Sequence, residues 1–351
     1  MSSMRSYLWA PMLVLAACGR QEAPGTTVDA GPTVDAATPR DAGPTLDAAT
    51  PRDAGPSLDA ATPGGPGDGS APEGPGPTLT TGHLKLISYN VQARPVLDDA
   101  RAAINLPIIG AMFGEFGVAD VQECFSQCDK LLAAAPQPNK YYFDQRQNFF
   151  SLANSGLAGL SWYPIEQVVT VNYQAKAELA DTVASKGVAL IRLNIDGFAV
   201  DVYNTHMQAG DSDGAHVAQS AQADELIAFI ATHSPSERTV ILHGDFNMGP
   251  ARPGKPLADF TPNHYSNEAD MLARTANFQK LVDQLGLSDV SDVLFGPVRD
   301  HIERVLYRPG QGVKVRPLSW EDRTATFLDP QGAPLSDSMP MVVELALERG
   351  G

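Results

Sequence analysis

Polar residues that can bind a cation or an anion lie next to five apolar, strand-like runs of this chain: they follow four of the runs and precede the fifth. The runs are LKLISYNVQ, VADVQECF, GFAVDVYNTHMQAG, RTVILHGDFNMGP and, near the C-terminus, PLSDSMPMVVELAL. Strand ends that meet at one edge of a sheet are a common way to place polar groups on a rigid scaffold. The amide and ionisable residues at these ends are Asn90, Glu123, His206, Asp245, Asn247 and Asp337.

Oxygen ligands dominate this set, and the residue types therefore indicate Mg²⁺, Mn²⁺ or Ca²⁺ and not zinc. Taken singly, each residue also has a structural interpretation. Asn90 can cap a turn, Glu123 can be an exposed acid at a helix N-terminus, and the GDFN segment can be a tight turn. The metal-site interpretation therefore depends on the order of the whole set.

The order and spacing of these segments resemble the endonuclease/exonuclease/phosphatase superfamily over nearly the whole C-terminal domain. The superfamily pattern is an Asn after the first strand, then Gln-Glu, Thr-His, Gly-Asp-x-Asn and a terminal Ser-Asp-His. Further segments are similar to bacterial and neutral sphingomyelinases. These are YNV at 89–91, GLAGLS and YPI within 156–165, DTVASKGV at 181–188 and THMQA at 205–209.

The resemblance implies an α/β fold of two stacked mixed β-sheets flanked by helices, which is a four-layer sandwich. It also implies metal-assisted hydrolysis of a phosphodiester. Glu123, Asn90 and Asp337 would hold Mg²⁺ or Mn²⁺, Asp245 would orient the attacking water, and Asn247 would fix the phosphate. His206 would stabilise the charge that develops on the phosphate.

The chain departs from the superfamily pattern after Asp337, where Ser338 stands in place of the terminal histidine. Serine cannot exchange protons near neutral pH, and losing such a group typically costs about 10²–10⁴ in rate. Glu303 in the DHIERVLY segment occupies a position where the family has an Asp. His301 lies two residues earlier, on the same face of an expected strand, and is the candidate to replace the missing imidazole.

Two periodic segments predict helices on the outside of this fold. Apolar residues recur at helical spacing over Val217–Thr232 and again over Ala269–Leu285. Cys124 and Cys128 lie four residues apart near an expected helix start, where they either form a disulfide or pack as thiols.

The N-terminal residues 1–18 have the features of an export signal. An apolar run of 11 residues, YLWAPMLVLAA, is too short to span a bilayer and fits a secretory signal peptide. It ends in Leu-Ala-Ala-Cys, which resembles a bacterial lipobox with Cys18 as the lipidated residue. We therefore expect a lipid-anchored protein of the bacterial cell envelope.

Residues 19–78 are expected to form a disordered linker between this anchor and the domain at 79–351. A 12-residue repeat rich in Pro, Ala and Asp begins at Asp29 and recurs at Asp41 and Asp53. Such a repeat cannot bury enough apolar surface to offset the entropy of the chain.

The charge of the domain favours a lipid substrate over nucleic acid. The chain carries a net charge of −16, and the first 78 residues hold four basic and nine acidic residues, which leaves about −11 for the domain. Such a charge disfavours broad contact with a polyanion. Together with this charge, the resemblance to sphingomyelinases implies a monomeric phosphodiesterase that depends on Mg²⁺ or Mn²⁺ and acts on a phospholipid head group. The alternatives are a secreted nuclease and a catalytically silent metal-binding domain.

Overall fold

The strands form two mixed sheets that lie face to face. The computed structural model describes residues 80–95, 97–147, 151–249, 265–297 and 301–349, and all of them belong to one compact unit. The predictions for residues 1–18, Cys18 and the repeats concern parts of the chain outside the described residues, and they remain predictions.

The sheet that contains β1 has the strand order β11-β12-β1-β2-β4-β3. We call it the β1 sheet. Strand β1 pairs antiparallel with β12 and parallel with β2. The members of the sheet are β1 (Thr80–Asn90), β2 (Val118–Gln122), β3 (Asn139–Phe143), β4 (Leu157–Ser161), β11 (Lys314–Asp322) and β12 (Met341–Arg349).

The second sheet, which we call the β8 sheet, has the order β5-β6-β7-β8-β10-β9. Here β7 and β8 are parallel, and β10 returns antiparallel to β8. Its members are β5 (Ile165–Asn172), β6 (Gly187–Ile195), β7 (Phe198–His206), β8 (Thr239–Asp245), β9 (Ser288–Asp289) and β10 (Glu303–Arg308).

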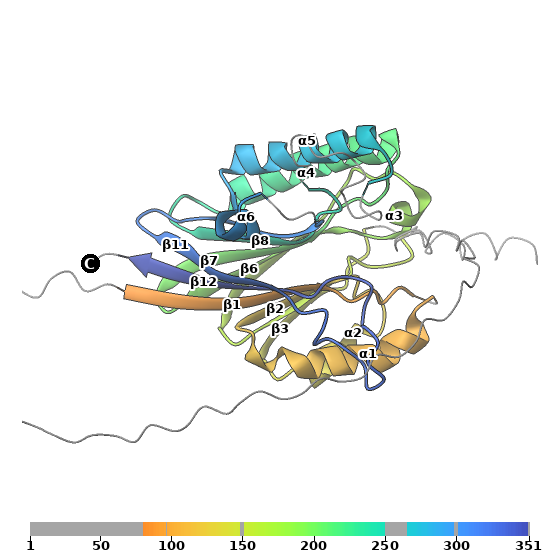
Figure 1. Ribbon diagram of the computed structural model, residues 1–351, viewed down its shortest axis with the longest axis horizontal. Helices are drawn as coiled ribbons and strands as arrows, with labels where there is room; N and C mark the ends of the chain where they lie inside the picture. The colour runs from red at the N-terminus through yellow and green to blue at the C-terminus, as the bar shows by residue number, and fades with distance from the viewer. Residues whose placement is uncertain (1–79, 96, 148–150, 250–264, 298–300, 350–351) are drawn as a thin grey trace, which may run out of the picture. The chain divides into compact units, whose positions relative to one another are not determined.

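Helices cover the outer face of each sheet, so that the described residues form four layers (Figure 1). Helices α1 and α2 lie below the β1 sheet, and α4 and α5 lie above the β8 sheet. The helical segments are α1 (Asp99–Ala111), the 3₁₀ helix η3 (Met112–Glu115), α2 (Cys128–Ala134), α3 (Leu179–Val183), α4 (Asp213–His233), α5 (Glu268–Leu285) and α6 (Val290–Phe295).

The two long helices confirm the periodicity prediction, and their boundaries follow from capping. Ser212 and Asn267 each accept a backbone N–H from the first turn of α4 and α5, respectively. Helix α5 ends at Gly286, which adopts the left-handed conformation that favours glycine at this position. None of the helices in the described ranges is long and apolar enough to cross a membrane.

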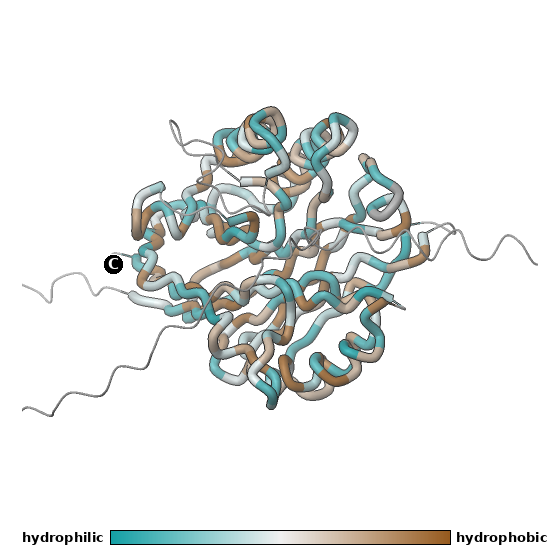
Figure 2. Tube along the Cα trace, turned by 45° about the vertical axis from the view of Figure 1, so that its right-hand side comes forward, coloured by the Kyte–Doolittle hydropathy of each residue, from teal (hydrophilic) through white to brown (hydrophobic). Residues whose placement is uncertain are grey.

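Apolar side chains fill the three spaces between the four layers. One cluster lies between the sheets and includes Leu86 and Ile191. A second joins the β1 sheet to α1 and α2, and a third joins the β8 sheet to α4 and α5. Figure 2 shows the same distribution, with the apolar stretches mainly in the interior strands. Because burying one large apolar side chain stabilises a fold by about 1.5–3 kcal/mol, these clusters fix the sheets relative to each other.

The register of the strands brings the polar ends to a single edge of the sandwich. Asn90 pairs with Gln122 in the β1 sheet. In the β8 sheet Asp245 pairs with His206 on one side and with Glu303 on the other. The predicted ends at Asn90, Gln122, His206 and Asp245 are therefore strand ends in the structure, whereas Asp337 lies four residues before β12 begins at Met341. The expected four-layer α/β sandwich is confirmed.

Candidate active site

Asn90 links the two sheets at this edge. Its side-chain amide donates one hydrogen bond to Glu123 Oε1 at 3.0 Å and another to Asp245 Oδ2 at 3.1 Å. Glu123 follows β2 of one sheet and Asp245 ends β8 of the other. The three predicted residues are therefore brought together, and all are buried.

Backbone conformation at the site departs from the ordinary regions at two predicted residues. Glu123 has φ of 54° and Asn247 has φ of 51°, both in the left-handed region. Asn tolerates this conformation, but Glu seldom adopts it, and such strain costs of order 1–3 kcal/mol. In Glu123 the turn directs the side chain toward Asn90 directly after β2 ends.

Burial makes Glu123 an unusual carboxyl group. The side chain is 3% exposed, and its Oε2 atom is buried without a hydrogen-bond partner. Removal from water raises its pKa to about 8, against an ordinary value of 4.5, although the Asn90 hydrogen bond and the Lys186 charge oppose this. Among the described residues, no hydrogen-bond donor offsets the removal of the Oε2 atom from water.

Asp245 and Asn247 form the second part of the buried cluster. Burial raises the pKa of Asp245 as well. The backbone N–H of Asn247 donates to Asp245 Oδ1 at 2.9 Å, and the Asn247 side chain donates to the carbonyl of Met207 at 3.0 Å. The GDFN segment is therefore a tight turn that also orients two predicted site residues.

His206 ends β7 beside this turn and is 1% exposed. Its Nε2 atom lies 3.8 Å from Asp245 Oδ2, and its Nδ1 atom is buried without a hydrogen-bond partner. Burial, assisted by the positive charge of Lys186, lowers the pKa of His206 well below 6.5. The imidazole is therefore neutral at neutral pH and offers one N–H donor.

A buried ion pair beside the cluster was not assigned to the site from the sequence. Lys186 Nζ lies 2.8 Å from Asp181 Oδ1 and donates to the carbonyl of Met207 at 3.0 Å. Asp181 in turn accepts the backbone N–H of Ala209 at 2.7 Å. Because the Lys186 charge acts on Glu123, Asp245 and His206, it is the buried cation of the site. The SKGV segment was the signal that could have identified it.

Asp337 lies at the exposed side of the same edge. Ser336 Oγ donates to the Asn90 carbonyl at 2.7 Å and so attaches this segment to the end of β1. The Asp337 side chain accepts a hydrogen bond from Gln92 Nε2 and lies 3.4 Å from Ser338 Oγ. The predicted Asp337 therefore belongs to the site, with a hydroxyl beside it where an imidazole was expected.

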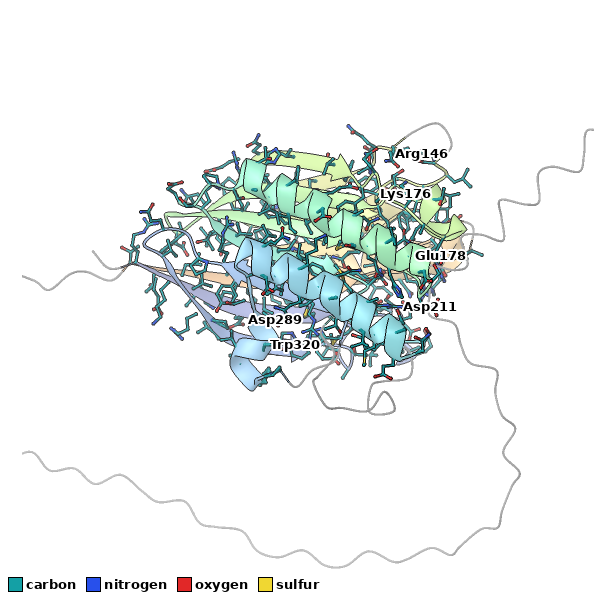
Figure 3. All side chains as sticks on the ribbon, turned by 90° about the horizontal axis from the view of Figure 1, so that it is seen from above. Arg146, Lys176, Glu178, Asp211, Asp289 and Trp320 are labelled. Atoms are coloured by element: carbon teal, nitrogen blue, oxygen red, sulfur yellow. A yellow bond between two sulfur atoms is a disulfide. The ribbon has the colours of Figure 1, made fainter. Side chains whose placement is uncertain are left out.

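His301 does not lie in a strand, contrary to expectation, because β10 begins only at Glu303. One ring nitrogen faces the Glu303 carbonyl and the other lies 3.4 Å from Ser291 Oγ. The ring packs against Trp320 with centroids 5.3 Å apart. In Figure 3, Trp320 lies well apart from Lys176 and Glu178. Glu303 is buried and pairs with Asp245 across β10 and β8. The replacement of the missing imidazole by His301 remains a prediction.

Cys124 and Cys128 form a disulfide directly after Glu123. Both residues are buried, and the bridge closes a short loop in front of α2. Phe125 within this loop packs against the His206 ring with centroids 6.5 Å apart. Of the two alternatives for these cysteines, the structure shows the disulfide, and the bridge restrains the loop that directly follows Glu123.

The donor set fits a hard divalent cation, although no cluster of three or more His, Cys, Asp or Glu side chains in the described ranges has metal-site geometry. The predicted set contains only two carboxylates, Glu123 and Asp337, with one amide. Mg²⁺ usually keeps several water ligands and needs only one or two protein carboxylates. The unpartnered Glu123 Oε2 is the atom that a cation would compensate.

A second polar layer lies beneath the site and joins the sheets. His243 contacts Asp120 Oδ2 at 2.9 Å and Ser88 Oγ at 3.1 Å, and Gln122 donates to Asn204 Oδ1 at 2.7 Å. Each contact joins a strand of the β1 sheet to a strand of the β8 sheet. These fully buried bonds fix the distance between the strand ends that carry Asn90 and Asp245.

Comparisons with known proteins agree with this fold. No family model matches the chain. It is 28% identical over 289 residues to sphingomyelin phosphodiesterase 2 of Rattus norvegicus, covering 76% of this chain and 65% of that protein. It is 25% identical over 288 residues to a sphingomyelinase of Mycobacterium bovis, covering 76% and 54%, respectively. The chain thus spans less than two thirds of the length of these relatives.

Solved structures have the same fold at low identity. Sphingomyelinase C from Streptomyces griseocarneus superposes with a TM-score of 0.52 and 20% identity, covering 75% of this chain and 99% of that one. A beta toxin variant of Staphylococcus aureus with bound magnesium ions gives 0.53 and 17%, covering 74% and 98%. D. rerio TDP2 complexed with a single-strand DNA product gives 0.54 and 14%, covering 75% and 98%. These structures show that the chain shares their fold.

Proposed function

We propose that the chain is a divalent-metal-dependent phosphodiesterase that cleaves a phospholipid head group, as a sphingomyelinase or phospholipase C does. The observation that carries the proposal is the buried cluster in which Asn90 joins Glu123 to Asp245. Two groups of sphingomyelinase relatives and the sphingomyelinase C fold support it.

Glu123 and Asp337 are the residues whose carboxylates would hold Mg²⁺ or Mn²⁺, and Asn90, whose NH₂ group donates to Glu123, would orient this ligand beside the metal. A bound cation would offset the negative charge of the phosphodiester and polarise it for attack. Glu123 contributes the uncompensated carboxylate oxygen. One solved neighbour of the same fold contains bound magnesium ions, which is consistent with this assignment.

The remaining site residues orient the attacking water, bind the phosphate and stabilise its negative charge. Asp245 orients the attacking water, and its raised pKa makes it a better proton acceptor near neutral pH than an ordinary carboxylate. Neutral His206 donates its free N–H to the phosphate, and Asn247 fixes the phosphate oxygen. Lys186 supplies a fixed positive charge behind them.

The absent terminal histidine reduces the expected rate. Ser338 cannot donate a proton to the departing alcohol at neutral pH, so this step depends on solvent. We therefore propose a slow hydrolase, whose turnover is below that of an enzyme with the complete site.

We also propose that the protein is exported and attached to the bacterial cell envelope through lipidated Cys18, and that it acts as a monomer. The N-terminal sequence supports this location. An anchored domain would meet lipid substrates at the membrane surface without a diffusional search.

The test measures phosphocholine release from sphingomyelin vesicles by residues 79–351, with Mg²⁺ and with EDTA. We expect release that depends on Mg²⁺ and disappears in Glu123→Gln. Glu344→Gln, which changes a carboxylate on the outside of β12, is the matched control. Plasmid nicking is measured beside it, because the same fold occurs in a protein solved with a DNA product.

Plasmid nicking without lipid cleavage would mean that the protein is a nuclease and not a lipid phosphodiesterase. Mg²⁺ binding without turnover on either substrate would leave a silent metal-binding domain. If neither turnover nor Mg²⁺ binding is found, the site assignment is wrong.

A further inference from the structure

Gln92 contacts two site residues at once. Its backbone N–H donates to Asn90 Oδ1 at 3.1 Å, and its side-chain amide donates to Asp337 Oδ2. The residue has φ of 48°, in the left-handed region. This conformation lets one residue reach Asn90 through its backbone and Asp337 through its side chain.

The backbone contact determines which way the Asn90 amide points. Because Asn90 Oδ1 accepts the Gln92 N–H, the NH₂ group of Asn90 faces Glu123 and Asp245. The opposite orientation would place the amide oxygen against two carboxylates. Gln92 thus orients the residue that joins the buried cluster.

Arg101, on α1, fixes the side chain of Gln92 in turn. Its Nη2 atom donates to Gln92 Oε1 and, at 3.0 Å, to the Gln92 carbonyl. With its oxygen held by Arg101, the Gln92 amide must present its NH₂ group to Asp337. Asp98 Oδ1, 3.6 Å from Arg101 Nη2, helps to hold the guanidinium in place.

The side chains of Arg101, Gln92 and Asp337 form a continuous hydrogen-bonded row that ends at Asp337, directly before the position of the missing histidine. A guanidinium is permanently charged, and hydrogen bonds in a row polarise one another. Arg101 therefore strengthens the donation from Gln92 to Asp337. Ser338, the neighbour of Asp337 in the sequence, is neutral and cannot do this.

We infer that Gln92 and Arg101 are positioning residues that orient Asn90 and Asp337, and that Arg101 supplies, through Gln92, a fixed positive charge near Asp337, the residue before the missing imidazole. The inference rests on the proposed phosphodiesterase function. Neither residue need touch the substrate, because both act through Asp337 and Asn90.

The first experiment measures kcat and KM for Mg²⁺-dependent phosphodiester cleavage in Gln92→Glu, Arg101→Ala and the double variant. Gln92→Glu keeps the shape of the side chain but replaces the donor by an acceptor facing Asp337. We expect kcat to fall about tenfold in each single variant with KM changed less than twofold, because positioning acts on the reacting groups. The double variant should lose less than the product of the two single losses.

Arg316→Ala is the matched control, because it removes an arginine that pairs with Glu348 on an exposed part of the domain. It should leave kcat unchanged. Guanidinium ions at millimolar concentration should partly restore kcat in Arg101→Ala, since the Arg101 side chain is 37% exposed and its site is open to solvent. The inference would be overturned if the kcat losses of the two single variants multiplied in the double variant. It would also be overturned if Arg316→Ala lowered kcat equally.

A second measurement does not depend on turnover. Calorimetric Mg²⁺ titration should give weaker binding in Gln92→Glu than in the unmodified domain, because a second carboxylate would then face Asp337 in place of the amide donor. Arg316→Ala should bind normally. If no phosphodiester is cleaved but this difference is found, the proposed function fails while the positioning role stands. Unchanged affinity in Gln92→Glu would overturn the positioning role itself.

Discussion

The candidate site has a buried half and an exposed half, and the two are built differently. Asn90, Glu123, His206 and Asp245 are each 1–4% exposed, whereas Asp337 is exposed. In the buried half, removal from water moves the pKa of three groups away from ordinary values. In the exposed half, the position of Asp337 depends on hydrogen bonds from Gln92 and Ser336.

The difference indicates where the site tolerates change. In the buried half the side chains of Asn90, Glu123 and Asp245 are joined by hydrogen bonds, and removing one of them leaves another unpaired at a cost of several kcal/mol. In the exposed half water can replace a lost partner. The histidine expected after Asp337 belongs to the exposed half, which is where its loss is least damaging to the fold.

The largest effect is expected from Glu123→Gln in the buried half. Removing the uncompensated carboxylate should lower turnover by at least about 100-fold and abolish measurable Mg²⁺ binding, because a neutral amide cannot offset the cation's charge. Calorimetry and vesicle assays measure the two quantities. Unchanged divalent affinity would mean that Glu123 does not hold the metal, and the contrast between the two halves would then lose its basis.

The next largest effect should be a pH dependence of the apparent Mg²⁺ affinity, which arises from the buried half of the site. Because burial raises the pKa of Glu123 to about 8, Mg²⁺ must displace a proton below that pH. Apparent affinity should rise by up to about tenfold per pH unit between pH 6 and 8. Titration calorimetry in buffers of different ionisation enthalpy measures the released proton.

The stability of the metal-free domain should fall as the pH rises over this range, whereas the apparent Mg²⁺ affinity should rise. The folded pKa of Glu123 lies above its ordinary value of 4.5, so the stabilising contribution of the bound proton is complete below that value. It is lost as the pH rises toward 8. Melting temperature in EDTA should therefore fall from pH 5 to pH 8, with a smaller fall in Glu123→Gln. Equal slopes in both proteins would contradict the raised pKa.

In the exposed half, Ser338→His should increase activity. An imidazole with an ordinary pKa near 6.5 beside Asp337 can exchange protons near neutral pH. We expect kcat to rise at least about tenfold with little change in KM, since the group acts in the transition state. Steady-state kinetics on vesicles measure both constants.

His301→Ala is the companion variant to Ser338→His. If His301 replaces the missing histidine, its removal should abolish the activity of the natural protein and affect the Ser338→His variant little. No gain in Ser338→His on lipid, nucleotide or simple phosphodiester substrates would favour the silent binding domain.

The smallest effect on activity is expected from opening the disulfide behind Glu123. Replacing Cys124 and Cys128 by Ser should lower the free energy of unfolding by about 2 kcal/mol, as expected for so short a loop. Mg²⁺ affinity should fall less than in Glu123→Gln, because the ligand remains. Denaturant unfolding measures the first quantity, with Ser126→Ala in the same loop as control. Unchanged stability would mean that the bridge does not restrain the buried half.

Local patterns in the sequence were sufficient for the elements and for most of the buried half. The alternation before Asn90 and the apolar run before Asp245 predicted β1 and β8, and helical spacing predicted α4 and α5. These patterns work because the side-chain period of a strand or helix depends on neighbouring residues alone. The GDFN and THMQA segments then identified the residues that follow the strands.

Only the tertiary structure decided which distant groups meet. Asn90 and Asp245 are 155 residues apart, and Gln92 and Asp337 are 245 apart. The Lys186 pair, the disulfide and the row from Arg101 through Gln92 to Asp337 have no periodic signal. Their function arises from burial and from the register between two sheets, neither of which a local pattern specifies. His301 illustrates the limit, because its spacing from Glu303 suggested a shared strand face that the start of β10 at Glu303 rules out.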